Sequence, residues 1–293
     1  MSDDATRDDG AIRGKWPVLD VLLRPDTIPR ETAAQEKAHR KAEYEALNRR
    51  LNGVRIGKYS YFLNYGYVAD GGSSFARVQP PDSHFDATSR RLVLEVLGDC
   101  PIDGKDVLDV SCGRGAVAVT LRDYFAPRSY LGIDLSAEAV AFCVSQHART
   151  NVEFRQGDAQ ALPLTNSSFD VVVNIEASHN YPDPASFFSE AARVLRPGGW
   201  FLYTDFLPPA TFDRHVALLK EQGFECLRDV DITANVVRSS DAIGDMRVKT
   251  YRDETEREYM VDFLAAPGSE TYLAFQDGRL QYRLYVFRLM TTA

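Results

Sequence analysis

From residue 106 onward, short apolar runs rich in valine and isoleucine alternate with stretches of helical periodicity. Alternation of this kind is typical of βαβ units, whose right-handed crossovers place the strands parallel to one another. We therefore expect an α/β fold built on a mostly parallel sheet. The predicted strands are 107–110, 130–134, 152–158, 169–175, 200–204, 224–230 and 280–289, and the helices between them are 115–124, 136–149, 184–194 and 211–222.

The alternation is interrupted between residues 231 and 278, where one helix is predicted near 252–264. The chain then closes with residues 280–289, which alternate between apolar and polar as a half-exposed strand does. We interpret the interruption as a lid inserted before the last strand.

The N-terminal part lacks this pattern. Residues 1–14 are predicted to be disordered, and residues 32–51 form a charged helix with few apolar positions. That helix either lies across the body of the protein or forms a contact in a homo-oligomer. We divide the chain into a tail with a helical extension at 1–57 and a main domain at 58–293, which contains an aromatic segment at 58–67, a helix near 83–97 and a cofactor-binding core at 104–206.

Composition fits one large domain with elaborations, since the 293 residues are 44% hydrophobic and 26% charged. The net charge is -8, with Lys and Arg scattered, so we expect no nucleic-acid partner and favour a small or apolar substrate. The four cysteines show no zinc-ligand spacing, so we expect free thiols and no metal. No signal peptide or 18-residue apolar run is present, which predicts a cytoplasmic protein without membrane insertion.

A ligand site is predicted where the first strand ends. Ligands of open α/β sheets lie beyond the carboxyl ends of the strands, and Gly113 and Gly115 let a ligand approach the backbone there. The helix that begins after Gly115 directs unpaired N–H groups at the site, which suits the carboxylate of a methionine moiety. Asp109 would then pair with the positively charged α-amino group.

Two further carboxylates follow the next strands. Asp134 lies 21 residues after Gly113, where an acidic side chain reaches both ribose hydroxyls, and Asp158 could accept a hydrogen bond from an adenine amino group. An NAD or other nucleotide site is the alternative. It is disfavoured because G-x-G-x-x-G and G-x-x-x-x-G-K-[ST] are absent, and because Asp109 would repel a pyrophosphate.

Several motifs resemble those of class I S-adenosylmethionine-dependent methyltransferases, namely DVSCGRG at 109–115, GIDLS at 132–136, GDA at 157–159 and RVLRPGG at 193–199. More closely, NYGY at 64–67, NIEASHNYP at 174–182 and YRLY at 282–285 look like the phthiotriol and phenolphthiotriol dimycocerosate methyltransferases and related enzymes of secondary metabolism, antibiotic biosynthesis included. The resemblance covers roughly residues 61–287. It implies a Rossmann-like seven-stranded sheet with an antiparallel last strand, S-adenosyl-L-methionine as cofactor, and cofactor contacts from Ser111, Leu135, Ala159 and Asn174.

Methyl transfer from a sulfonium requires alignment of donor and acceptor and, for a hydroxyl or amine, removal of a proton. His179 lies just beyond the fourth strand and is the first candidate for general base. Asp205 ends the fifth strand, where it can fix the imidazole tautomer; the spacing of the pair resembles that of sugar O-methyltransferases in this superfamily. In the plainer interpretation His179 contacts the cofactor and Asp205 caps a turn, while Glu176 serves as base or lines the sulfonium end.

Other candidates are less specific. Tyr65 and Tyr67 either pack in the core or bind the cofactor through hydroxyl groups and ring faces. His84, His147 and His215 fall on predicted helices away from strand ends, where a solvated surface position is expected.

The leading hypothesis is methylation of a hydroxyl on an apolar natural product, polyketide or lipid. The alternative is C- or N-methylation of a prenyl, indole-like or amine acceptor, with Glu176 and aromatic rings stabilising a cation. A nucleic-acid methyltransferase would need a basic groove or an Asn/Asp-Pro-Pro-aromatic motif, and residues 174–177 read NIEA. A cofactor-binding scaffold without catalysis would have no use for His179 or Asp205.

Overall fold

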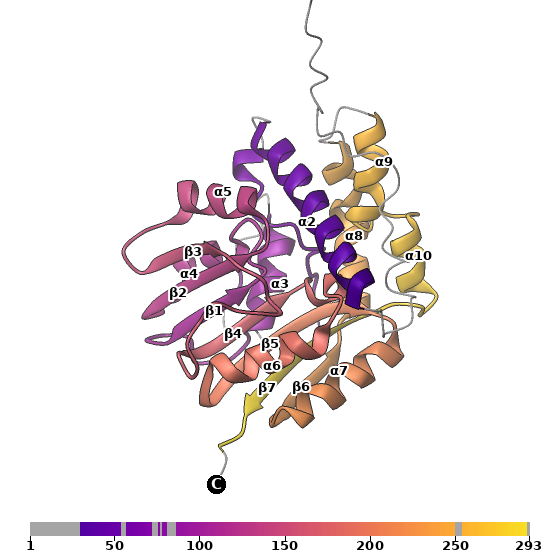
Figure 1. Ribbon diagram of the computed structural model, residues 1–293. Helices are drawn as coiled ribbons and strands as arrows, with labels where there is room; N and C mark the ends of the chain where they lie inside the picture. Colours follow the sequence, from indigo (N-terminus) through magenta and orange to yellow (C-terminus); the bar gives the residue numbers. More distant parts are fainter. Residues whose placement is uncertain are drawn as a thin grey trace, which may run out of the picture.

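Seven strands form one mixed sheet in the order β3-β2-β1-β4-β5-β7-β6 in the computed structural model (Figure 1). The structure describes residues 30–53, 57–71, 76, 78–80, 86–249 and 254–291, so the predicted disorder of residues 1–14 and the position of His84 lie outside the described part.

The strands are β1 (Asp106–Val110), β2 (Ser129–Asp134), β3 (Val152–Gln156), β4 (Phe169–Ile175), β5 (Leu195–Leu207), β6 (Phe224–Asp231) and β7 (Gln281–Leu289). The helices are α2 (Arg30–Gly53), α3 (Ala87–Leu97), α4 (Ala116–Tyr124), α5 (Ala137–His147), α6 (Pro184–Val194), α7 (Pro209–Glu221), α8 (Thr233–Lys249), α9 (Glu254–Phe263) and α10 (Glu270–Gln276), with 3-10 turns η1 (Gly57–Tyr59) and η2 (Ser178–Asn180).

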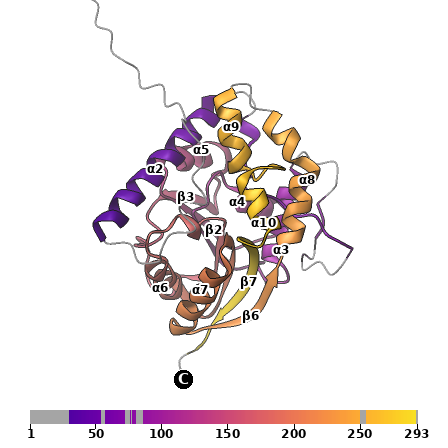
Figure 2. The same cartoon turned by 90° about the vertical axis from the view of Figure 1, so that its right-hand side faces the viewer.

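The predicted α/β class and the antiparallel last strand are confirmed. β1 to β5 pair in parallel, whereas β7 runs antiparallel to both β5 and β6. The centre of the sheet is covered on both faces, by α6 and α7 on one side and by α3, α4 and α5 on the other (Figures 1 and 2). Val171, Val172 and Val173 have no exposed area, as expected for a central parallel strand. This layering leaves the carboxyl ends of β1 to β5 as the edge on which a site can form.

The insertion between β6 and β7 contains three helices rather than the one predicted. α8 and α10 lacked a clear apolar periodicity because small and polar residues form part of their buried surface. Ser239 has no exposure and donates a hydrogen bond to the Tyr65 carbonyl, and Ser240 bonds to the Ala265 carbonyl. Gly244 is needed for packing, since a Cβ there would lie 2.6 Å from the Pro267 ring.

α2 lies across the body of the protein, over the carboxyl edge of the sheet (Figures 1 and 2). Arg114, at the start of α4, holds it there: the guanidinium is buried and donates to the Asn48 and Asn52 side chains on α2 and to the carbonyls of Gly57 and Ser60. One face of the helix is therefore covered by its own chain. The oligomer contact expected of this helix stays a prediction.

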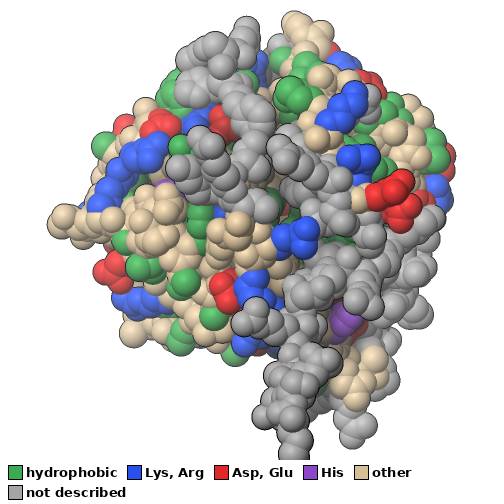
Figure 3. All heavy atoms as spheres, turned by 90° about the horizontal axis from the view of Figure 1, so that it is seen from above, with side chains coloured by type: hydrophobic (Ala, Val, Ile, Leu, Met, Phe, Trp, Pro, Cys, Tyr) green, Lys and Arg blue, Asp and Glu red, His purple; other side chains and the backbone are tan. Residues whose placement is uncertain are grey.

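The surface carries dispersed charge. On the face seen from above, Lys and Arg side chains are separated by apolar and acidic ones rather than forming one stripe (Figure 3). No helix in the described part of the chain is both long and apolar enough to span a bilayer.

Replacing Arg114 with Met should lower the free energy of unfolding by about 3–5 kcal/mol, because the substitution leaves several buried carbonyl and amide groups without their donor. Urea denaturation measures the change. The matched control is Arg122→Met on α4, the helix that follows Arg114; its side chain is half exposed, and the substitution should change stability by less than about 0.5 kcal/mol. Equal losses in both variants would contradict the role given to Arg114.

Candidate active site

One pocket opens at the carboxyl ends of β1, β2 and β4 and encloses about 1340 Å³ of space, open mouth included. The predicted site residues that line it are Tyr65, Asp109, Ser111, Gly113, Asp134, Leu135, Asp158, Ala159, Glu176 and His179. Sequence reasoning missed a second group on α2 and in the aromatic segment: Lys37, Arg40, Lys41, Tyr44, Asn48 and Leu63.

The loop after β1 forms the floor of the pocket. Gly113 adopts φ +53°, and a Cβ there would meet no atom within 4 Å, so the backbone faces open space. Its N–H donates to Asp134 Oδ2 at 2.8 Å, while Ser136 N–H donates to Oδ1 at 2.8 Å. Gly115 does not provide the predicted ligand access: a Cβ there would lie 2.7 Å from His147 Cδ2, so this glycine permits α4 to pack against α5.

Asp109 is a buried carboxylate with one strong partner. It accepts a hydrogen bond from Tyr130 Oη at 2.7 Å, yet burial raises its pKa to about 7. Burial also raises the pKa of Asp134, although three backbone N–H groups oppose the shift. Two adjacent carboxylates are thus held in a site that favours a positively charged partner.

Asp158 connects the end of β3 to α2. Its Oδ2 accepts from Lys37 Nζ at 2.7 Å, and its Oδ1 accepts from the Gln160 backbone at 2.9 Å. Both side chains of the ion pair are about one-third exposed, so the pair contributes little to the stability of the fold. Its main effect is to position α2.

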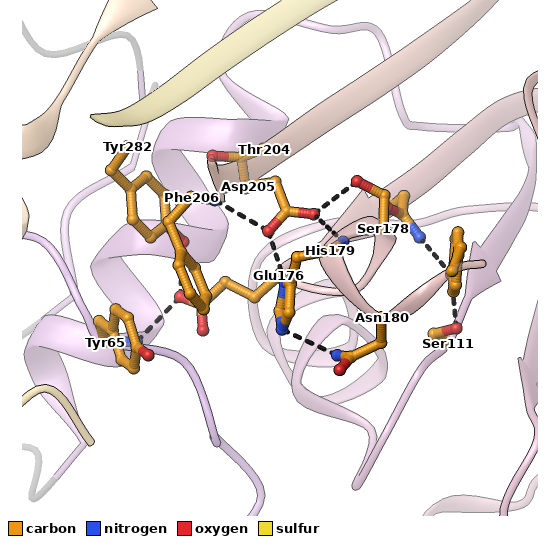
Figure 4. Close-up of polar contacts among 12 residues, drawn as sticks. Tyr65, Ser111, Glu176, Ser178, His179, Asn180, Thr204, Asp205, Phe206 and Tyr282 are labelled. Carbon is orange, nitrogen blue, oxygen red and sulfur yellow. Dashed lines mark hydrogen bonds and ion pairs between the residues drawn. The ribbon is translucent and has the colours of Figure 1, made fainter. Parts of the chain in front are cut away.

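His179 and Asp205 lie in contact, as the sequence predicted (Figure 4). The distance between His179 Nδ1 and Asp205 Oδ1 is 2.7 Å, and Oδ2 accepts from the His179 backbone at 3.0 Å. Burial alone would raise the pKa of Asp205, but the His179 charge, hydrogen bonds from His179 and Ser178, and the Phe206 N–H lower it below its usual range. Asp205 is fully buried behind His179 and does not itself line the pocket.

Asn180 indicates which imidazole nitrogen carries the proton. Its amide Nδ2 lies 2.8 Å from His179 Nε2 and 3.1 Å from Tyr44 Oη. Since an amide NH₂ only donates and the ionised Asp205 only accepts, the network assigns the proton to Nδ1 and leaves the lone pair on Nε2.

Glu176 adopts a left-handed backbone, with φ +49°. For a residue other than glycine this conformation is strained, and such residues gather at functional sites. Its Oε1 accepts from the Tyr65 backbone at 2.9 Å and from Tyr282 Oη at 2.5 Å (Figure 4). The Phe206 ring packs against the His179 ring, with 4.4 Å between their centroids.

Besides Gly115, four positions differ from the predicted cofactor contact or surface exposure. Tyr67 does not reach the pocket; it lies near Glu95 and Arg238, and its backbone N–H bonds to Thr88. Asn174 does not line the pocket; its amide donates to the Val110 carbonyl and to Tyr181 Oη. The expected solvated histidines are also corrected, since His215 is buried and His147 packs 4.8 Å from the Tyr61 ring.

Comparison with known proteins agrees with the predicted family. Residues 108–203 match a family model described as a methyltransferase domain. A fatty-acid O-methyltransferase of Mycolicibacterium smegmatis is 35% identical over 231 residues, covering 77% of this chain and 82% of that protein. The phthiotriol/phenolphthiotriol dimycocerosates methyltransferase of Mycobacterium tuberculosis is 34% identical over 236 residues, covering 77% of this chain and 84% of that protein. Geranyl diphosphate C-methyltransferase of Streptomyces coelicolor, solved with S-adenosyl-L-homocysteine, shares the fold with a TM-score of 0.59 and 18% identity. The match covers 84% of this chain and 97% of that protein.

The raised pKa of Asp109 predicts a pH-dependent cost in stability. A folded-state pKa near 7 means that wild type should lose stability relative to Asp109→Asn as pH rises from 4 to 7, by up to about 4 kcal/mol for a shift of roughly three pKa units. Urea denaturation of both proteins across that range measures the difference.

Asp106 on the same strand is the matched control. Hydrogen bonding from Arg128 lowers its pKa, so its contribution has the opposite sign: it is present above the usual Asp pKa and is lost as pH falls below about 4. The raised pKa of Asp109 is contradicted if Asp109→Asn and Asp106→Asn show the same change in unfolding free energy, relative to wild type, across the pH range.

Proposed function

The chain belongs to the S-adenosylmethionine-dependent methyltransferases, and from this premise we propose that it methylates a hydroxyl oxygen on an apolar natural-product or lipid acceptor, with His179 as general base. The observation that carries the proposal is the contact between His179 and the buried Asp205 at the wall of the pocket. The names of the two relatives, which act on fatty-acid and phthiotriol-type lipids, support an apolar acceptor.

The residues on the floor of the pocket fit the cofactor. When bound, S-adenosylmethionine supplies the methyl group and leaves as S-adenosylhomocysteine. We assign the ribose hydroxyls to Asp134 and the α-amino group to Asp109, whose carboxylate needs a cation to remain ionised below pH 7. Gly113 leaves space for the methionine moiety, and Asp158 is placed for the adenine edge next to Ala159.

The proton path follows from the imidazole tautomer. Asp205 holds the Nδ1 proton, so the lone pair on Nε2 of His179 accepts the proton that the acceptor hydroxyl loses as its oxygen attacks the methyl carbon. In the complex the acceptor hydroxyl takes the place of the Asn180 amide on Nε2. Asp205 keeps its negative charge and stabilises the imidazolium that forms.

The acceptor side is built from apolar and aromatic groups. Leu63, Tyr65, Phe206 and Phe263 line the pocket, and Tyr44 adds a hydroxyl through Asn180. Such walls bind a hydrocarbon acceptor by excluding water. The position of His179 Nε2 then selects which hydroxyl oxygen of the acceptor receives the methyl group.

A second function is favoured by one observation. The Glu176 carboxylate accepts from the Tyr65 backbone N–H and from the Tyr282 hydroxyl, which places a negative charge in an aromatic part of the site that could stabilise a cation formed during C-methylation of a prenyl acceptor. In that case Glu176 would matter more to turnover than His179. N-methylation of an amine would again use His179.

Asp134→Ala should raise the Kd for S-adenosylhomocysteine about 10- to 100-fold, because two hydrogen bonds to a charged acceptor are lost. Isothermal titration calorimetry measures the Kd. Glu138→Ala removes a partly exposed carboxylate from the first turn of α5 and should leave the Kd unchanged. A similar loss in both variants would show that net charge, not ribose contact, sets the affinity.

His179→Gln should reduce kcat for a long-chain alcohol or other hydroxylated lipid by about 10²–10⁴-fold, since the general base is lost. The same variant should keep its Kd for S-adenosylhomocysteine and its rate on a fatty acid, whose carboxylate is already deprotonated. Release of S-adenosylhomocysteine measures turnover. Undiminished turnover of the alcohol would falsify the base assignment, and a larger loss in Glu176→Gln would favour C-methylation.

A further inference from the structure

Five polar groups form an unbroken chain through the buried layer behind His179. His179 Nδ1 lies 2.7 Å from Asp205 Oδ1, Asp205 Oδ2 lies 2.6 Å from Ser178 Oγ, and Ser178 Oγ lies 2.7 Å from Tyr203 Oη. The chain reaches His215 on α7, whose Nδ1 lies 3.0 Å from Tyr203 Oη. Figure 4 shows its first part, in which Ser178 and His179 approach Asp205 from η2.

Only one placement of protons supplies a donor at every contact. The ionised Asp205 can only accept, so Ser178 must donate to it, and Ser178 then has no proton left for Tyr203. Tyr203 must therefore donate to Ser178, which leaves His215 Nδ1 as the donor to Tyr203. All donors after His179 thus point in one direction and converge on one carboxylate.

Burial makes this chain sensitive to each of its members. Ser178 and Tyr203 are 1% exposed and His215 is 4% exposed. In such surroundings each hydrogen bond polarises the next, by about 10–30% of its strength. A change at α7 is therefore transmitted to the carboxylate that holds the imidazole.

We propose that Ser178, Tyr203 and His215 form a donor chain that sets the basicity of His179, which makes His215 a positioning residue for the reaction. The role of the donor chain in catalysis rests on the proposed function, whereas its effect on the titration of His179 can be measured without substrate. Donation to Asp205 spreads the carboxylate charge, so the imidazolium of His179 is stabilised less. Loss of a donor raises the pH at which His179 titrates.

Other ionisable groups surround the chain and are unchanged by the test. Tyr65, Tyr181 and Tyr282 lie within electrostatic range of Asp205, and Glu176 lies within range of Tyr65 and Tyr282. Tyr285 of β7 stacks on the Tyr203 ring at 5.8 Å between centroids, and Phe188 of α6 covers His215. Tyr285 therefore offers a matched control, because its hydroxyl lies in the same layer without belonging to the chain.

The experiment follows the titration of the His179 imidazole by NMR in the full chain, with its resonance assigned by its loss in His179→Gln. We expect the midpoint to rise by about one pH unit in Ser178→Ala, which removes a direct donor to a charge. It should rise by about 0.2–0.5 units in Tyr203→Phe, which weakens that donor. Tyr285→Phe should leave the midpoint unchanged.

His215 is tested by two substitutions that do not touch the pocket. His215→Leu removes the donor and should behave like Tyr203→Phe, whereas the amide of His215→Asn can donate from the Nδ1 position and should restore the wild-type midpoint. Equal midpoints in Tyr203→Phe, Tyr285→Phe and wild type would overturn the proposal. If Tyr203→Phe does not fold, equal midpoints in the Leu and Asn variants of His215 would overturn it.

The rate profile separates this proposal from the assignment of the base. If His179 is the base, the acid limb of kcat/KM for a hydroxylated acceptor moves with the NMR midpoint in each variant. If the NMR midpoint of His179 shifts but the acid limb of kcat/KM does not, the donor chain is supported and the assignment of His179 as general base is contradicted. Loss of turnover in His179→Gln combined with an unmoved midpoint in the chain variants supports the base and contradicts the donor chain.

Discussion

The active edge of the sheet depends on one buried charge, the Asp205 carboxylate at the end of β5. A carboxylate without exposure is tolerated only where donors surround it, and here four donors from His179, Ser178 and Phe206 converge on its two oxygens. Two of those donors are backbone N–H groups, so the path of the chain is fixed along with the side chains. The turn after β4, including the strained backbone of Glu176, is shaped around this charge.

The opposite wall of the pocket depends on a second buried charge, the guanidinium of Arg114. It connects the loop that follows β1 to α2 through hydrogen bonds to carbonyl and amide groups. α2 is thereby held over both the floor and the acceptor wall, where Lys37 contacts Asp158 and Tyr44 contacts Asn180. Cofactor and acceptor regions are thus coupled through one helix that precedes both in the sequence.

The charges of the site also separate two kinds of acceptor. A fatty acid already presents a nucleophilic carboxylate, whereas an alcohol must lose a proton; under the proposed function, only the alcohol benefits from a histidine whose tautomer is fixed by Asp205. Asp109 illustrates a related conflict between stability and binding: burial disfavours its ionised form, and a cationic ligand would remove that cost.

The α/β class, the positions of the strands and the carboxylates at their ends could be predicted from the amino-acid pattern, because strand periodicity and βαβ topology bring strand ends to one edge. The contact between His179 and Asp205 was predictable on the same ground. Three features emerged from the folded protein alone: α2 covers the pocket, Tyr67 and Gly115 face away from it, and His215 is buried in a chain leading to Asp205. Those outcomes depend on packing between segments distant in sequence, which local patterns do not encode.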